Sequence, residues 1–203
     1  MTPQVIDISA DNGKVNWADV AEAGVTNVIL RASLGYGEAD KNLATNAAGA
    51  SAAGLTVSFY HLAYTHPNVS AIDDATKQSK YFCDTIAATN ITPKYLALDL
   101  ETATTLSRAD YLLWVQTFLS NVQSITGVTP MVYSYKYWLD AHLPSDHQLA
   151  SSYPLWLACY DNVSKPSCPV GWNSYLLWQY SETGAVSGCV GHVDCSMFNP
   201  SNI

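Results

Sequence analysis

Two carboxylates lie two residues apart at the end of one apolar run, Tyr95-Leu-Ala-Leu-Asp99-Leu-Glu101-Thr102. If this run is a β-strand, its side chains alternate between two faces, so Asp99 and Glu101 share one face and the leucines share the other. Neighbouring carboxylates repel each other, and in a half-buried setting one of them keeps its proton to higher pH. A neutral carboxylic acid beside an ionised one can protonate a glycosidic oxygen and stabilise an oxocarbenium-like transition state.

Two further acids follow apolar residues in other strand-like runs. Asp7 lies in Val-Ile-Asp7-Ile-Ser, and Asp194 lies in His-Val-Asp194-Cys-Ser near the end of the chain. If the sheet closes on itself, the first and last strands are neighbours, and these acids can meet the first pair over one mouth. Each acid could instead be an ordinary strand-end residue or a helix cap. Three coincident cases favour one catalytic cleft, with Glu101, Asp99, Asp7 and Asp194.

Aromatic and polar side chains end or lie within several other strand-like runs. Sugar rings bind through apolar faces stacked on aromatic rings, and their hydroxyls are held by polar groups. A cleft lined in this way suits an oligosaccharide, although many of the aromatic residues could simply fill the core. The residues expected to bind substrate are Tyr60, Tyr133, Trp156, Gln179 and His61.

These residues must be positioned by strands that alternate with segments of helical period. Apolar residues three and four apart predict helices over residues 72–86 and 111–125, and Ser107 with Asp110 is a variant capping box before the second helix. Strand, helix and strand recurring every ~25–40 residues is typical of right-handed βαβ units and a mostly parallel sheet. The strand-like runs begin near Gln4, Asn27, Leu55, Tyr95 and Thr129.

The last third of the sequence has a different pattern. After a short helix near residues 137–142, strand-like runs at 154–160, 174–180 and 191–197 have only turn residues between them. Such connections are too short for parallel crossovers, which predicts an antiparallel or mixed ending. Five βα units and three further strands predict an α/β fold, a closed but irregular eight-stranded barrel of TIM-barrel type, with an open twisted sheet as the second choice.

Composition limits the class of protein and its partners. The 203 residues, 48% hydrophobic and 13% charged, predict one globular domain over residues 1–203. Seventeen acidic and nine basic residues give a net charge of −8, so neither nucleic acid nor an anionic membrane is an expected partner. No apolar stretch approaches the ~20 residues that span a bilayer. No pattern of metal ligands is apparent, so no metal and no cofactor are expected.

The first residues and the cysteines leave alternatives open. Residues 1–7 lack a basic region and an apolar segment, so either the protein is made without a signal peptide or a signal has been removed. Short-loop disulfides and reduced core cysteines are equally plausible. The cysteines are Cys83, Cys159, Cys168, Cys189 and Cys195, of which 159 with 168 and 189 with 195 are close enough in sequence for such bridges.

Several short motifs follow one another along the chain. They are Val-Ile-Asp7-Ile-Ser9, Val-Asn-Trp17, Val28-Ile-Leu-Arg31-Ala-Ser33, Ala53-Gly-Leu55, Phe59-Tyr-His61, Leu98-Asp-Leu-Glu101, Leu155-Trp-Leu-Ala158, Trp178-Gln-Tyr-Ser181 and Gly191-His-Val-Asp194. Taken in order, these motifs resemble those of the glycoside hydrolase family 25 muramidases, the Chalaropsis-type lysozymes. The resemblance runs from about residue 4 to residue 198, and the ordered set is more specific than any single motif.

The resemblance implies a flattened (βα)5β3 barrel that hydrolyses the β-1,4 bond between N-acetylmuramic acid and N-acetylglucosamine in bacterial cell-wall peptidoglycan. It implies that Glu101 is the general acid and that Asp99 steadies the substrate's 2-acetamido group as this group attacks the anomeric carbon. Asp7 and Asp194 match the other acidic positions of the cleft, and Tyr60 and Tyr133 match residues that line it. The protein is then expected to act as a monomer outside the cytoplasm, as a secreted enzyme or a phage-type endolysin.

The sequence departs from the family pattern at the rim of the expected cleft. Arg31-Ala-Ser-Leu-Gly35 lacks the usual acid after the second strand, and Ala10-Asp-Asn12 replaces an aromatic residue. These differences bear on subsite preference, and no separate wall-binding module is expected. Two other functions are open: a chitinase or endo-N-acetylglucosaminidase, whose longer acidic motif is absent because positions 95 and 97 are Tyr and Ala, and a non-catalytic glycan-binding protein.

Overall fold

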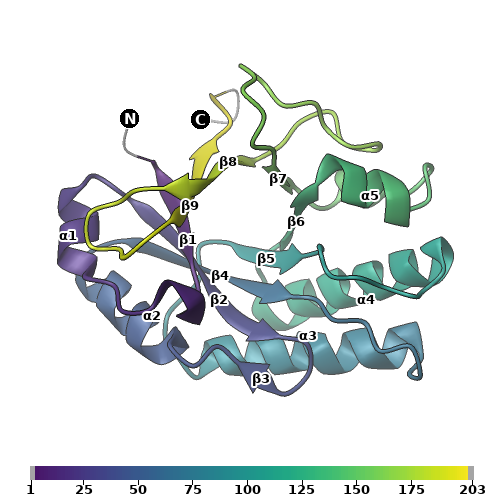
Figure 1. Cartoon of the computed structure of the whole chain (residues 1–203). Helices are drawn as coiled ribbons and strands as arrows, with labels where there is room; N and C mark the ends of the chain where they lie inside the picture. Colours follow the sequence, from purple (N-terminus) through teal and green to yellow (C-terminus); the bar gives the residue numbers. More distant parts are fainter. Residues whose placement is uncertain (1–2, 201–203) are drawn as a thin grey trace.

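Eight strands pair edge to edge in a closed ring in the computed structural model, which describes residues 3–200. They are β1 (Val5–Ile8), β2 (Asn27–Leu34), β4 (Thr56–Leu62), β5 (Leu96–Asp99), β6 (Met131–Tyr135), β7 (Leu155–Ala158), β8 (Leu177–Gly184) and β9 (Val193–Phe198). Their order is β1-β9-β8-β7-β6-β5-β4-β2, and pairing of β1 with β2 closes the ring (Figure 1). A short β3 (Glu38–Ala39) pairs with the end of β2. The predicted eight-stranded barrel is confirmed.

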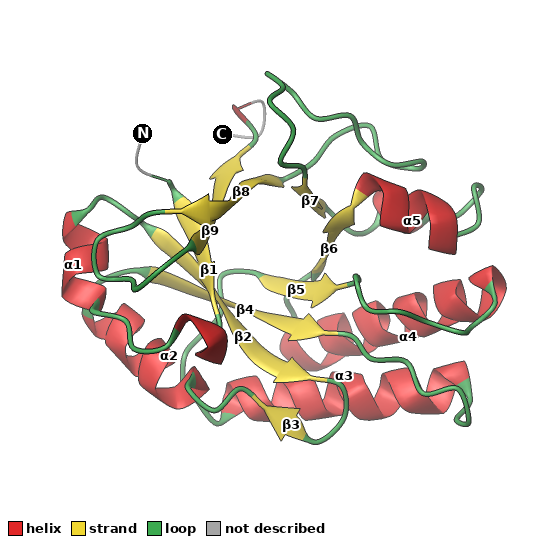
Figure 2. Ribbon diagram, viewed as in Figure 1, coloured by secondary structure: helices red, strands yellow, loops and turns green. Residues whose placement is uncertain are grey.

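Within the described residues, five α-helices alternate with the first strands and lie on the outside of the barrel (Figure 2). They are α1 (Trp17–Glu22), α2 (Leu43–Ala52), α3 (Ala71–Ala87), α4 (Arg108–Thr126) and α5 (Lys136–His142). The two helices predicted from apolar spacing are α3 and α4, and the predicted cap of α4 is present because the Ser107 hydroxyl accepts the Asp110 N–H at 3.1 Å. Each helix follows a strand of the ring, so the (βα)5β3 order is confirmed.

The last strands of the barrel run in mixed directions, as predicted, but the antiparallel pairs are not where the short connections placed them. Within the ring formed by residues 3–200, β1, β2, β4, β5, β6, β7 and β8 run parallel to one another. The remaining ring strand, β9, is antiparallel to β8 on one side and to β1 on the other, and the short β3 outside the ring is antiparallel to β2. The expectation that the connection between β7 and β8 is too short for a parallel pair is therefore wrong. Residues 159–176 return the chain to the start of β8 as an irregular loop without a helix.

The strands separate two apolar regions. Leu96, Leu98 and Leu100 are buried with the helices, in one cluster with residues such as Phe118 of α4. The barrel interior holds a second cluster, and the alternation predicted for β5 is confirmed because Ala97 belongs to it. Burying one large apolar side chain stabilises the fold by about 1.5–3 kcal/mol. The interior cluster comprises Val5, Ile29, Ala97, Met131, Tyr133, Trp156, Ala158 and Leu177.

The state of the cysteines and the character of the helices bear on two of the predictions from the sequence. All five cysteines are free thiols, which corresponds to the reduced alternative, and Cys83 and Cys195 are buried. No helix within residues 3–200 is long and apolar enough to cross a membrane.

Candidate active site

The four predicted acids line one small cavity, of about 50 Å³, at the mouth of the barrel. Asp7 of β1 lies directly opposite Asp194 of β9 in the antiparallel pair, and Asp99 ends β5 beside Tyr133 of β6. Glu101 follows two residues after Asp99, on the same face as predicted. Parallel strands point their carboxyl ends at one edge, and the amino end of the antiparallel β9 lies at the same edge, so acids distant in sequence meet there.

A larger cavity of about 410 Å³ adjoins the first, since Glu101 and Tyr133 line both. Its volume falls in the range of small-molecule sites, and its wall combines aromatic rings with polar groups, as sugar sites do. Glu101 is exposed where the two cavities meet, whereas Asp7 and Asp99 are only 8% and 4% exposed. The other residues of this wall include Tyr135, Lys136, Tyr137, Tyr160, Asp161, Ser167 and Glu182.

Asp7 and Asp194 form a closely interacting pair of carboxyls. Burial, and then the charge of Asp194, raises the pKa of Asp7 well above its ordinary value. Burial also raises the pKa of Asp194, to about 6, although the hydrogen bond from Asp7 opposes that rise. Asp7 is therefore the proton donor of the pair and Asp194 the acceptor.

Asp99 and Glu101 form the second pair. Burial, followed by the charges of Glu101 and Asp7, raises the pKa of Asp99 well above the usual range. Burial, followed by the charges of Asp194 and Glu182, raises the pKa of Glu101. Among residues 3–200, Asp99 Oδ1 is the one buried side-chain oxygen or nitrogen without a hydrogen-bond partner. A buried acceptor of this kind is costly unless a ligand supplies a donor.

Gln179 connects the acids to the aromatic wall from beneath the cavity. Its Oε1 accepts hydrogen bonds from Tyr133 at 2.7 Å and Tyr160 at 2.6 Å, and its Nε2 donates to Asp7 Oδ2 at 2.9 Å. Gln179 is 1% exposed and does not line either cavity, so it holds the site's side chains instead of facing a ligand.

The predicted aromatic residues lie in the site. Tyr60, Tyr133 and Trp156 line the small cavity with the four acids. The ring centroid of Trp156 lies 4.5 Å from that of Tyr133 and 6.4 Å from that of Tyr60, and its Nε1 donates to Ser196 at 3.0 Å. Trp156 is nearly fully buried and forms the floor under the two tyrosines.

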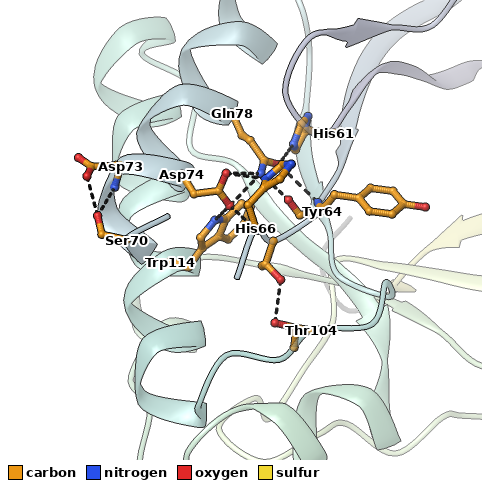
Figure 3. Close-up of polar contacts among 10 residues, drawn as sticks. His61, Tyr64, His66, Ser70, Asp73, Asp74, Gln78, Thr104 and Trp114 are labelled. Atoms are coloured by element: carbon orange, nitrogen blue, oxygen red, sulfur yellow. Dashed lines mark hydrogen bonds and ion pairs between the residues drawn. The ribbon is translucent and has the colours of Figure 1, made fainter. Parts of the chain in front are cut away.

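His61 is the predicted site residue that the structure places elsewhere. It is fully buried on the outer face of β4, where it stacks on Phe118 and bonds to Ser33. It also bonds to Gln78 (Figure 3). Consecutive strand residues face opposite sides, so His61 cannot share the cavity with Tyr60. His61 lines neither cavity, so the prediction that it binds substrate is wrong.

The wall of the larger cavity includes residues that were not predicted, of which Tyr160 and Glu182 are examples. Tyr160 follows Trp156 and Ala158 at two-residue intervals, so strand alternation would have identified it. Glu182 lies beyond an irregularity in the pairing of β8 with β9, between Gln179 and Ser181. Such an irregularity changes which side chains face inward, so the sequence pattern gave no signal for Glu182.

Within residues 3–200, no group of three or more His, Cys, Asp or Glu side chains is arranged to hold a metal ion. In the described part of the chain, the arrangement provides an acid with a raised pKa at a cleft, a buried carboxyl oxygen of Asp99 without a hydrogen-bond donor, and an aromatic wall. These are the groups that acid-catalysed cleavage of a glycosidic bond requires.

Comparisons with known proteins agree with this geometry. Residues 6–189 match the family "Glycosyl hydrolases family 25". The chain is 30% identical to lysozyme M1 of Streptomyces globisporus, covering 98% of this chain and 68% of that protein, and 27% identical to the N,O-diacetylmuramidase of Chalaropsis sp, covering 98% and 97%. The bacterial lysozyme of Streptomyces coelicolor superposes with a TM-score of 0.83 at 28% identity, covering 98% of this chain and 93% of that one. This chain belongs to glycosyl hydrolase family 25.

Proposed function

We propose that the protein is a lysozyme that hydrolyses the β-1,4 bond between N-acetylmuramic acid and N-acetylglucosamine in peptidoglycan. The observation that carries the proposal is the position of Glu101, an acid with a raised pKa at the junction of two cavities, beside the buried Asp99. The family and the activities named for the similar lysozyme and diacetylmuramidase support it.

Glu101 is the general acid in this proposal. It is exposed to the cleft, so a glycosidic oxygen can reach it. Partial burial of its carboxyl and the charges of Asp194 and Glu182 raise its pKa, so that it stays protonated to higher pH. Protonation of the leaving oxygen by a positioned acid contributes about 10²–10⁴-fold to the rate.

Asp99 receives the substrate's 2-acetamido group. Its Oδ1 has no donor among residues 3–200, and the amide N–H of an N-acetyl sugar is a donor of the required kind. A hydrogen bond donated to a carboxylate favours the charged form, so substrate binding lowers the pKa of Asp99. The ionised Asp99 then orients the acetamido oxygen toward the anomeric carbon and, by its charge, disfavours early loss of the proton from Glu101.

The remaining residues shape the cleft. Asp7 and Asp194 share a proton and bound the cavity on the side of β1 and β9. Tyr60 and Tyr133 present rings and hydroxyls to a sugar, with Trp156 as their support. Bacterial cell wall is the expected partner, so the protein acts outside the cytoplasm.

The deciding experiment compares Glu101→Gln with Glu22→Gln, a control at an exposed residue of α1. Both variants are incubated with purified peptidoglycan, and the released fragments are identified by mass spectrometry. We expect the wild type and Glu22→Gln to release fragments with N-acetylmuramic acid at the new reducing end, and Glu101→Gln to lose at least ~10²-fold in rate while folding normally.

Three results would contradict the proposal. Near-full activity of Glu101→Gln would show that Glu101 is not the general acid. New reducing ends on N-acetylglucosamine, or activity on chitin oligosaccharides alone, would indicate a chitinase or endo-N-acetylglucosaminidase. Glycan binding without any release by the wild type over long incubation would indicate a binding protein.

A further inference from the structure

The Glu101 carboxylate is positioned only through its backbone. None of the hydrogen bonds between side chains described in residues 3–200 involves it, and it lies just after β5, outside regular structure. The backbone is fixed on one side because the Ser134 hydroxyl donates to the Leu100 carbonyl at 2.5 Å and Leu100 N–H donates to the Tyr133 carbonyl at 2.9 Å. Whatever fixes the other side of this loop also decides where the acid points.

The other side is held by the loop that follows β4. The Thr102 hydroxyl donates to the Ala63 carbonyl, and the Thr65 hydroxyl donates to Thr104 Oγ1 at 2.8 Å. Thr104 Oγ1 also accepts the Leu106 N–H at 3.2 Å, so the same oxygen shapes the loop after Glu101. We call the Thr65–Thr104 hydrogen bond the threonine clamp.

The clamp is anchored by a polar network between β4, α3 and α4 that is buried except at His66 (Figure 3). Asp74 of α3 accepts hydrogen bonds from the His66 N–H at 3.2 Å, from Trp114 Nε1 at 2.8 Å and from Gln78 Nε2 at 3.0 Å. His66 Nδ1 lies 2.9 Å from the same carboxylate. Thr65 thus lies directly before a residue whose backbone and side chain are both tied to a helix.

The network has one arrangement of donors and acceptors. Burial lowers the pKa of His61 to about 4, so its ring is neutral near neutral pH. Its Nε2 faces Gln78 Oε1 at 3.0 Å and must carry the proton, while its Nδ1 accepts from the Ser33 hydroxyl at 2.9 Å. Gln78 is then fixed with its amide nitrogen toward Asp74 and the Tyr64 carbonyl. A network satisfied in this way is rigid.

We propose that Thr65 and Thr104 are positioning residues for Glu101: their clamp transfers the rigidity of the Asp74 network to the loop that carries the general acid. The proposal rests on the proposed function of Glu101. Neither threonine lines either cavity, so their effect on catalysis passes through the loop. A reacting group misplaced by about 1 Å costs on the order of 10²-fold in rate, so loosening the loop affects the chemical step more than substrate binding.

The test uses Thr65→Val, Thr104→Val and the double variant, with Thr105→Val as the matched control. Valine keeps the shape of threonine and removes the hydroxyl, and Thr105 is an exposed residue of the same loop. Steady-state kinetics on a soluble peptidoglycan fragment give kcat and KM separately, and thermal unfolding verifies that each variant is folded at the assay temperature. Thr65→Ser restores the hydroxyl and serves as the rescue variant.

We expect each clamp variant to lower kcat about tenfold, with KM within about twofold of the wild type. Thr65→Val removes the clamp alone, whereas Thr104→Val removes the clamp and the acceptor of the Leu106 N–H, so the double variant should match Thr104→Val. Thr105→Val and Thr65→Ser should retain wild-type kcat. Clamp variants that equal Thr105→Val in kcat, or that change KM alone, would overturn the inference. Loss of activity in Glu101→Gln together with unaffected clamp variants would overturn this inference and leave the proposed function standing.

Discussion

The substitution Asp194→Asn should stabilise the protein at neutral pH. Asp194 has a pKa of about 6 in the folded chain, above the ordinary value of 3.8. Between about pH 4 and pH 6 the folded chain holds a proton that the unfolded chain has released, so the stability contributed by this group falls as the pH rises through that window. Asparagine does not titrate and avoids this loss.

The magnitude follows from the size of the pKa rise. A rise of about two units corresponds to roughly 3 kcal/mol at about 1.4 kcal/mol per unit. Asp194 is half-buried, and solvent screening reduces the figure to about 1–2 kcal/mol. The asparagine also removes the charge that raises the pKa of Asp7, which acts in the same direction.

The assay is urea unfolding of the wild type and the variant at pH 4 and pH 8. Asp140→Asn is the control, for which the free energy of unfolding should change in the opposite direction. Burial alone would raise the pKa of Asp140, but hydrogen bonds from Lys136 and the Val170 N–H outweigh it and lower that pKa. Asp140→Asn should therefore destabilise the protein at pH 8.

The result that would refute the reasoning is equal or lower stability of Asp194→Asn at pH 8. A free energy of unfolding that differs equally from the wild type at pH 4 and pH 8 would also refute it. Either outcome would mean that the cleft acids do not strain the fold at neutral pH.

Other substitutions test separate parts of the structure. Glu182→Gln removes a charge that raises the pKa of Glu101, so the alkaline limb of the pH–kcat profile should move to lower pH; an unchanged limb would exclude Glu182 as a cause. Gln179→Met should cost about 2–4 kcal/mol in urea unfolding, because it removes two buried hydrogen bonds and one that is part-buried, and a cost below 1 kcal/mol would contradict this. Gly49→Ala would place a methyl group 2.3 Å from the Trp17 ring, so its melting temperature should fall by the equivalent of about 1–3 kcal/mol; an unchanged melting temperature would show that the ring can move.

Much of the fold could be predicted because its signals are local. Period-two runs and apolar spacing predicted the strands and the two long helices, and the Ser107 cap was readable from two residues. The direction of β8 was not predictable in this way, since a long irregular loop can return the chain as a helix does. Nothing local distinguishes such a loop from a series of turns.

The candidate site was predictable in part for a similar reason. Alternation alone placed Asp99 and Glu101 on one face, and the same rule, if applied to His61 beside Tyr60, would have excluded that histidine. The position of Glu182 depends on an irregularity between two strands, which no spacing in the sequence reveals.

The sequence by itself determined the order of strands and helices and which carboxylates sit at strand ends. Only the tertiary structure decided that Asp7 meets Asp194, because that contact needs β1 to pair with β9 and close the ring. It also decided the chemistry of the acids: a carboxyl's pKa depends on its burial and on charges brought near it through space. Those quantities exist only once strands distant in the chain are packed together.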